Sequence, residues 1–144
     1  VHQLLADADI SCTCVAHEET REIGDLTLKA YDGTHVEIFE DYGLVQNTGF
    51  LLDTRLFYPG DAYTIPKEAV DLLALPVAGP WCKVADAIRY AIELEPKRAF
   101  PVHDATLSED GRKVTYPHCT RELYREGIEF QVIDDGATVD FGGA

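Results

Sequence analysis

Short apolar runs of strand length dominate the first half of the chain. Residues 49–52 and 56–58 form two such runs, and each is too short for a helix, so they predict two strands joined by a tight turn. Residues 26–31 alternate between apolar and polar positions and are rich in β-forming side chains, which predicts another strand. Residues 34–39 alternate again and predict a fourth, with a turn at Asp32-Gly33 before it.

The N-terminal segment carries weaker signals. Residues 2–8 have the pattern of the end of a helix. Residues 10–16 are apolar enough for a strand, which would place Cys12 and Cys14 on one face. Residues 17–22 are charged and predict a connection.

The second half of the chain changes from strand to helix periodicity and back. Residues 70–77 are almost continuously apolar, which is typical of a strand covered on both faces. Residues 81–94 carry an apolar stripe at helical spacing, and Pro96 ends the pattern. Residues 98–104 are a short run that ends in His103-Asp104. This order predicts two parallel strands joined by a helical crossover.

The C-terminal part completes the predicted domain. Residues 108–113 predict a polar loop, residues 116–125 a final helix, and residues 128–133 and 137–141 a terminal hairpin. No repeat or low-complexity tract interrupts the pattern. We therefore expect one α/β domain over residues 1–144, built on a mixed sheet.

The composition is that of a globular protein with a strong acidic bias, since 46% of the residues are hydrophobic and the net charge is −14. This charge argues against non-specific binding to nucleic acid or to anionic membranes, because both need basic patches. No apolar run approaches the roughly 18 residues of a membrane span. The cysteines lack the paired spacing of a zinc ribbon, so we expect free thiols and a cytoplasmic protein.

The start of the chain predicts a fragment. The sequence has no methionine, and Val1 lies inside a helical pattern with no capping residue before it. We therefore expect a piece of a longer protein.

Three side chains that can bind metals stand at the ends of predicted strands or in the loops after them: His35, Asp61 and His103. Zinc and iron accept imidazole and carboxylate ligands, and a carboxylate can bridge two ions. Gly60 has no Cβ, so the backbone before Asp61 can turn sharply or approach a ligand closely. No local motif joins the three residues, so only the fold can bring them together.

The order of these segments resembles the C-terminal half of the metallo-β-lactamase-fold superfamily over residues 26–109. It is most similar to the branch that includes the ascorbate-phosphate lactonases. Three blocks carry the resemblance: residues 49–61 with their final Gly-Asp, the apolar run 70–77, and residues 96–103 with their final histidine.

The resemblance implies a metal-dependent hydrolase. It implies that Asp61 bridges two metal ions, that His35 binds the first ion and that His103 binds the second. The ions would be two zinc ions, or manganese or iron. A metal-activated hydroxide would attack an ester, lactone or phosphoester in a small-molecule substrate.

The chain departs from this family in one respect: the first metal motif, His-x-His-x-Asp-His, does not occur in it. The resemblance therefore implies that this chain alone binds metal weakly and is inactive. It also implies half of an αββα sandwich, with helices on one face of the sheet and the other face exposed. Such a patch is rare on a soluble monomer, so we expect a homodimer or a partner that supplies the missing half.

Two alternatives stay open. The chain could be a catalytically incomplete binding or assembly module that uses the exposed sheet face as an interface, or a truncated piece of an ordinary enzyme. Among single residues, Asp104 would orient a ligand or cap a turn, Trp81 would line a pocket or anchor the core, and Cys82 would be a nucleophile or an interior thiol.

Overall fold

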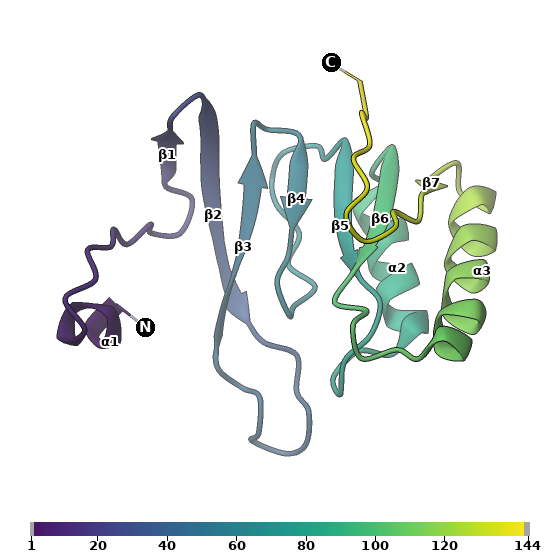
Figure 1. Ribbon diagram of the computed structural model, residues 1–144, viewed down its shortest axis with the longest axis horizontal. Helices are drawn as coiled ribbons and strands as arrows, with labels where there is room; N and C mark the ends of the chain where they lie inside the picture. Colours follow the sequence, from purple (N-terminus) through teal and green to yellow (C-terminus); the bar gives the residue numbers. More distant parts are fainter. Residues whose placement is uncertain (1, 143–144) are drawn as a thin grey trace.

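The computed structural model describes residues 2–142, which contain one mixed sheet of seven strands whose spatial order follows the chain (Figure 1). The predicted α/β class is confirmed, and residues 1, 143 and 144 of the predicted domain lie outside the described part. The strands are β1 (Thr20–Ile23), β2 (Leu26–Thr34), β3 (Gln46–Leu52), β4 (Leu56–Tyr58), β5 (Leu72–Pro76), β6 (Arg98–Val102) and β7 (Glu129–Phe130). The helices are α1 (His2–Asp7), α2 (Val84–Leu94) and α3 (Glu109–Arg125).

Strands β1 to β4 pair antiparallel, and the predicted hairpin at residues 49–58 is part of β3 and β4. The predicted turn at Asp32-Gly33 is wrong, and residues 35–39 form no strand. Strand β2 continues through both residues because Asp32 pairs with Thr48 of β3, whose hydroxyl also donates a 2.9 Å hydrogen bond to the Asp32 carboxylate. Cross-strand pairing therefore overrides the local turn signal.

The charged connection predicted at residues 17–22 contains a strand that the sequence pattern did not indicate. Strand β1 pairs only with β2 and all of its residues are exposed. Charged side chains suit such an edge, because they discourage pairing with a further strand. Exposure on both faces also removes the apolar alternation by which a strand is recognised.

Strands β4 to β7 pair in parallel, and α2 connects β5 to β6, so the predicted parallel crossover is confirmed. All five residues of β5 are buried, as expected for a strand covered on both faces. This places the loops after β4, β5 and β6 at one end of the sheet, where open α/β sheets commonly bind ligands.

The last helix is longer than its apolar pattern predicts, since the expected loop at residues 108–113 is helical from Glu109 onward. Ser108 caps the helix, because its hydroxyl accepts a hydrogen bond of 3.1 Å from the Gly111 amide. Glu109 and Asp110 in the first turn add favourable interactions with the helix dipole. The predicted helix at residues 116–125 is its second half.

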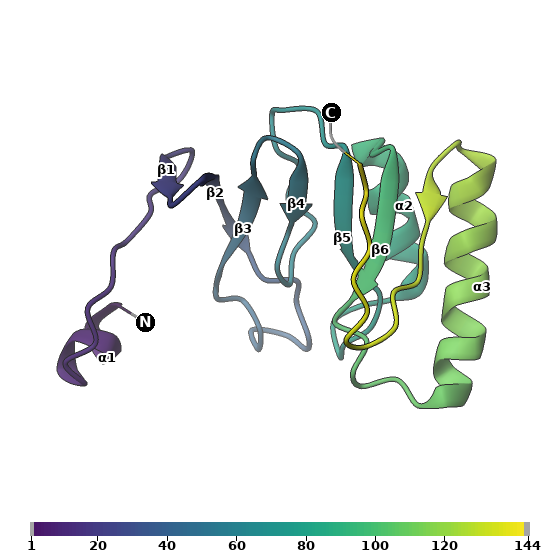
Figure 2. The ribbon, with the colours of Figure 1, turned by 45° about the horizontal axis from the view of Figure 1, so that its top comes forward.

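The predictions for both ends of the chain are partly wrong. Residues 10–16 form no strand, and the terminal hairpin is absent from the described residues, where β7 pairs in parallel with β6 instead. Residues 131–141 run back across β5 and β6 (Figures 1 and 2). Arg55 and Arg98 hold the segment there, because each donates a hydrogen bond to the Phe141 carbonyl, at 2.8 and 2.7 Å.

The two faces of the sheet differ. Helices α2 and α3 cover one face at the β5–β7 end (Figure 2), and Leu51 and Phe57 are buried in the core on that side. The opposite face of β3 and β4 carries apolar side chains that are half-buried or exposed: Phe50, Leu52, Leu56 and Tyr58. Within residues 2–142, no helix combines the length and the apolar character needed to cross a bilayer.

Candidate metal centre

Asp61 follows β4 in a turn that depends on Gly60. Gly60 has a φ of +70°, and a Cβ there would overlap the carboxamide of Asn47. Asn47, on β3, supports the turn twice: its Nδ2 donates a 2.7 Å hydrogen bond to the Pro59 carbonyl, and its Oδ1 accepts one of 2.8 Å from the Asp61 amide. Of the two roles expected for Gly60, the sharp turn is therefore found, and the Asn47 side chain lies against it.

His35 lies just after β2 and is attached to the Asp61 turn through its neighbour. The Val36 amide donates a 2.9 Å hydrogen bond to the Asp61 carbonyl, and the His35 amide donates one to Val45, also at 2.9 Å. The Nδ1 atom of His35 lies 2.6 Å from the Val36 carbonyl oxygen. A carbonyl can only accept, so Nδ1 carries a proton, and the neutral ring keeps its lone pair on Nε2.

His103 follows β6 with a φ of +59°, a left-handed conformation that few residues other than glycine adopt. The loop is attached to α3 through Asp104. The Asp104 carboxylate accepts a hydrogen bond from the Tyr116 hydroxyl and lies 3.5 Å from Nε of Arg112, and its carbonyl accepts one from the Leu107 amide. Asp104 thus closes the turn and binds α3.

The structure brings the three predicted residues together around the Asp61 carboxylate. His35 Nε2 lies 3.4 Å from one carboxylate oxygen of Asp61, and His103 Nε2 lies 3.3 Å from the other. The side chains of His35, Asp61 and His103 are 15%, 32% and 29% exposed. One oxygen for each histidine is the arrangement that a bridging carboxylate needs.

The donor set is incomplete for a closed metal shell. Among residues 2–142, no group of three or more His, Cys, Asp or Glu side chains is arranged to hold one metal ion. The centre instead offers two pairs, His35 with Asp61 and His103 with Asp61, which share the carboxylate. Structural zinc takes four ligands and catalytic zinc usually three from protein, so neither pair closes a site.

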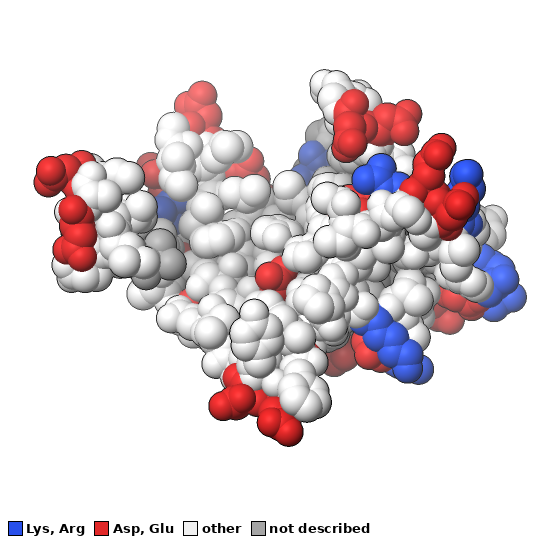
Figure 3. Space-filling view, turned by 60° about the horizontal axis from the view of Figure 1, so that its bottom comes forward, with Lys and Arg blue, Asp and Glu red and all other residues white. Residues whose placement is uncertain are grey.

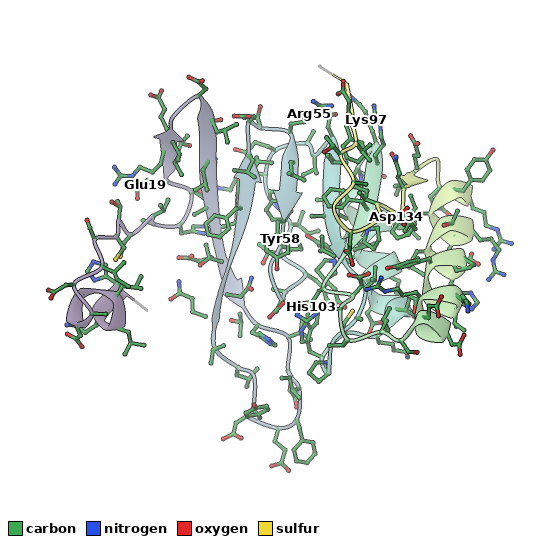
Figure 4. All side chains as sticks on the ribbon, viewed as in Figure 1. Glu19, Arg55, Tyr58, Lys97, His103 and Asp134 are labelled. Carbon is green, nitrogen blue, oxygen red and sulfur yellow. The ribbon has the colours of Figure 1, made fainter. Side chains whose placement is uncertain are left out.

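Two aromatic side chains border the centre. Tyr58, labelled with His103 in Figure 4, has its pKa raised by burial and then by the negative charge of Asp61. Trp81, in the loop between β5 and α2, lies with its ring 5.8 Å from the ring of each histidine. Trp81 is 7% exposed, so most of its ring is buried against its neighbours.

Cys82 is an interior thiol. Burial raises its pKa, and the hydroxyl of Tyr63 lies 3.7 Å from its sulfur. The Cys82 thiol in turn faces the Pro76 carbonyl at 3.6 Å. A raised pKa reduces the thiolate fraction, which is the opposite of what a nucleophile needs.

The surface around this end of the sheet is mostly uncharged. Figure 3 shows most acidic side chains at the periphery, most lysine and arginine on one side, and a broad, largely uncharged area with acidic atoms near its middle. The loops after β5 and β6 also line a hollow of about 400 Å³, with Gly79, Cys82 and Leu107 in its wall.

Sequence reasoning missed Asn47 and Tyr116, which hold the Asp61 turn and the His103 loop. Asn47 is a single polar residue at the start of β3, and nothing in its neighbours points to a partner fourteen positions away. The helical pattern placed Tyr116 on the last helix, but nothing in the pattern indicated that its hydroxyl binds the Asp104 carboxylate.

The fold agrees with comparisons to known proteins. A family described as a β-lactamase superfamily domain matches residues 2–103. The chain belongs to the β-lactamase superfamily. A curated relative, Protein Rv0786c of Mycobacterium tuberculosis, is 34% identical to this chain over 124 residues. The match covers 83% of this chain and 57% of the relative, so the chain spans little more than half of that protein.

Solved structures share the fold at low sequence identity. Igni18, a metallo hydrolase from the archaeon Ignicoccus hospitalis, superposes with a TM-score of 0.77 at 17% identity, over 99% of this chain and 66% of its own. A putative metal-dependent hydrolase from Parabacteroides distasonis has a TM-score of 0.62 at 17% identity. That match covers 92% of this chain and 61% of the hydrolase. An isothiocyanate hydrolase from Delia radicum gut bacteria has a TM-score of 0.61 at 16% identity. That match covers 97% of this chain and 63% of the hydrolase. The predicted metallo-β-lactamase fold is confirmed.

Proposed function

We propose that the full-length natural protein is a metal-dependent hydrolase in which Asp61 bridges two divalent ions, with His35 on the first ion and His103 on the second. The observation that carries this proposal is the pairing of each Asp61 oxygen with the Nε2 of a different histidine. The metallo hydrolases among its structural neighbours support it.

The protein's own residues supply the geometry. Asn47 and the Val36 amide fix the backbone on either side of Asp61, and the Val36 carbonyl fixes the His35 tautomer. When bound, the ions would acidify a water molecule and polarise the scissile bond of an ester, lactone or phosphoester. Zinc is the first candidate, and manganese and iron accept the same donors.

The remaining ligands are proposed to come from outside the 144 residues. The three donors of this chain fit three positions of a two-metal centre and leave both shells open. The half-buried apolar face of β3 and β4 is the proposed contact for that missing part, or for a second copy of the chain. Four free cysteines, Cys12, Cys14, Cys82 and Cys119, favour a reducing compartment such as the cytoplasm.

The test is the metal content and hydrolytic activity of the full-length protein. We expect about two equivalents of zinc, manganese or iron per chain by mass spectrometry, and turnover in a panel of lactones, esters and phosphoesters. Asp61→Ala should remove most of the metal and the activity. The matched control is Asp86→Ala, which removes a carboxylate on α2 that pairs only with Arg89. A metal-free wild-type protein that is folded and active would overturn the proposal.

The alternative, a binding module without chemistry, makes a different prediction. The exposed apolar face of the sheet favours it, since an interface needs no metal. In that case His103→Ala and Asp61→Ala would leave the properties of the full-length protein unchanged.

A further inference from the structure

Trp81 contacts both histidines of the candidate centre. Its ring centroid lies 5.8 Å from that of His35 at an interplanar angle of 71°, and 5.8 Å from that of His103 at 76°. Both are edge-to-face contacts, the arrangement that aromatic rings favour. The indole therefore contacts two imidazoles that come from separate loops.

The indole is placed at a cost to stability. Its Nε1–H is buried, and within residues 2–142 it has no hydrogen-bond acceptor. A buried tryptophan N–H usually finds a partner, and leaving one unpaired lowers stability. A ring without the N–H would avoid this cost, so stability alone does not explain an indole here. Local costs of this kind are concentrated at functional sites.

Gly79 allows the indole to approach His103. A Cβ on Gly79 would lie 3.1 Å from Trp81 Nε1 and 3.2 Å from His103 Cε1, so any side chain there would press on both rings. Behind the indole, the Tyr63 ring lies 5.7 Å away and packs in turn on Tyr90 at 5.2 Å. The indole is therefore supported from the core side and presses on the histidines from that side.

We propose that Trp81 is a positioning residue: a rigid spacer whose edge contacts fix the His35 and His103 rings so that each Nε2 stands at its own oxygen of Asp61. The inference rests on the proposed function, because it takes the two histidines as metal ligands. Side chains that orient metal ligands commonly change metal affinity 10- to 100-fold when removed. A residue that only anchors the core would change folding stability and leave metal affinity alone.

The first measurement follows the indole of Trp81, the single tryptophan among the 144 residues, whose signal in the full-length protein is assigned from its loss in Trp81→Phe. Zinc is titrated into ¹⁵N-labelled full-length protein, and the indole Nε1–H signal of Trp81 is followed by NMR. That signal should move in step with zinc occupancy, since both rings beside it would bind metal. A signal that stays in place while zinc binds would overturn the spacer role.

The second measurement compares zinc affinity and the cobalt absorption spectrum among three variants. Trp81→Leu should weaken zinc binding about 10- to 100-fold and alter the cobalt spectrum. Trp81→Phe keeps an aromatic edge and should recover most of the affinity. Leu123→Ala is the control, because Leu123 is fully buried in the core on α3 and belongs to neither the Trp81 nor the Tyr63 ring contacts. It should lower the melting temperature and leave zinc affinity unchanged.

The outcomes separate the inference from the proposed function. If the folded wild-type protein binds no zinc, the proposed function fails, and the spacer role fails with it. If the wild type binds zinc and Trp81→Leu binds it equally well, only the spacer role fails. If Leu123→Ala loses as much affinity as Trp81→Leu, the loss reflects general destabilisation of the core and the inference is wrong.

Discussion

The candidate centre depends on two residues whose backbones adopt a left-handed conformation. Gly60 turns the chain before Asp61 at a φ of +70°, and His103 presents its ring after β6 at a φ of +59°. Glycine meets this demand without strain, whereas a residue with a Cβ meets it only when its surroundings hold it there. For His103, the attachment of Asp104 to α3 provides that restraint.

Replacing Gly60 by alanine should destabilise the fold through two effects. The left-handed conformation costs an alanine roughly 1–2 kcal/mol, and the added methyl would overlap the Asn47 carboxamide. We expect a total loss of about 2–4 kcal/mol in the free energy of unfolding, measured by urea denaturation.

Gly136→Ala is the control for this prediction. Gly136 has a φ of +80° and no atom within 4 Å of the position of its Cβ, so only the conformational cost applies. Equal losses for the two variants would show that Asn47 moves aside freely, and would contradict its role as the support of the Asp61 turn.

At the scale of elements, the loop after β6 is held by helix α3. The Asp104 carboxylate binds the Tyr116 hydroxyl and Arg112, both on α3. Burial, followed by the neighbouring Asp104 carboxylate, raises the pKa of Tyr116 to about 12. The helix therefore contributes a proton-dependent attachment to the candidate site.

The raised pKa sets the pH range in which this attachment is lost. The folded state binds the Tyr116 proton more tightly than the unfolded state, so the contribution is complete below a pH of about 10, the ordinary pKa of tyrosine. It is lost as the pH rises from about 10 towards 12. The stability difference between wild type and Tyr116→Phe should therefore be constant at neutral pH and shrink over that range.

Denaturation midpoints measured from pH 7 to 12 check this expectation. Tyr124→Phe, on the outer surface of the same helix at 79% exposure, is the matched control, and its difference from wild type should not change with pH. A difference for Tyr116→Phe that stays constant to pH 12 would show that its hydroxyl contributes nothing through Asp104.

For the whole molecule, the two faces of the sheet have different environments. The helix-covered face forms the core, whereas Phe50, Leu52, Leu56 and Tyr58 on the opposite face are only partly covered. Residues 131–141 cover the neighbouring part of that face, over β5 and β6 (Figure 1). An apolar face of this kind is a candidate interface.

We expect the 144-residue chain to self-associate through this face. Tyr58→Glu would place a charge on it and should shift sedimentation velocity profiles towards the monomer at micromolar concentration. Tyr124→Glu adds the same charge on the outside of α3 and should leave the profile unchanged. A wild-type chain that is monomeric at every concentration would contradict self-association. The face would then be assigned to contact with the rest of the full-length protein.

The sequence predicted the elements whose signals are local. Strand β5 was predicted from its continuous apolar run, and α2 from its apolar stripe. The β5–α2–β6 crossover followed from the order of these elements. It failed where a partner distant in sequence decides the outcome. Asp32 and Gly33 predicted a turn, but both lie in β2 because they pair with Thr48 and Asn47 of β3. Strand β1 was not predicted, because an exposed edge strand has no apolar pattern.

The candidate site divides in the same way. Residue type and position near the ends of predicted strands indicated His35, Asp61 and His103 as candidate ligands, and the resemblance to the metallo-β-lactamase fold implied their roles. Which oxygen of Asp61 faces which histidine, the Asn47 support of the turn and the contact of Trp81 with both rings depended on the fold alone. Hydrophobic periodicity reports which face of an element is buried, whereas distances between side chains on separate loops arise only when the sheet assembles.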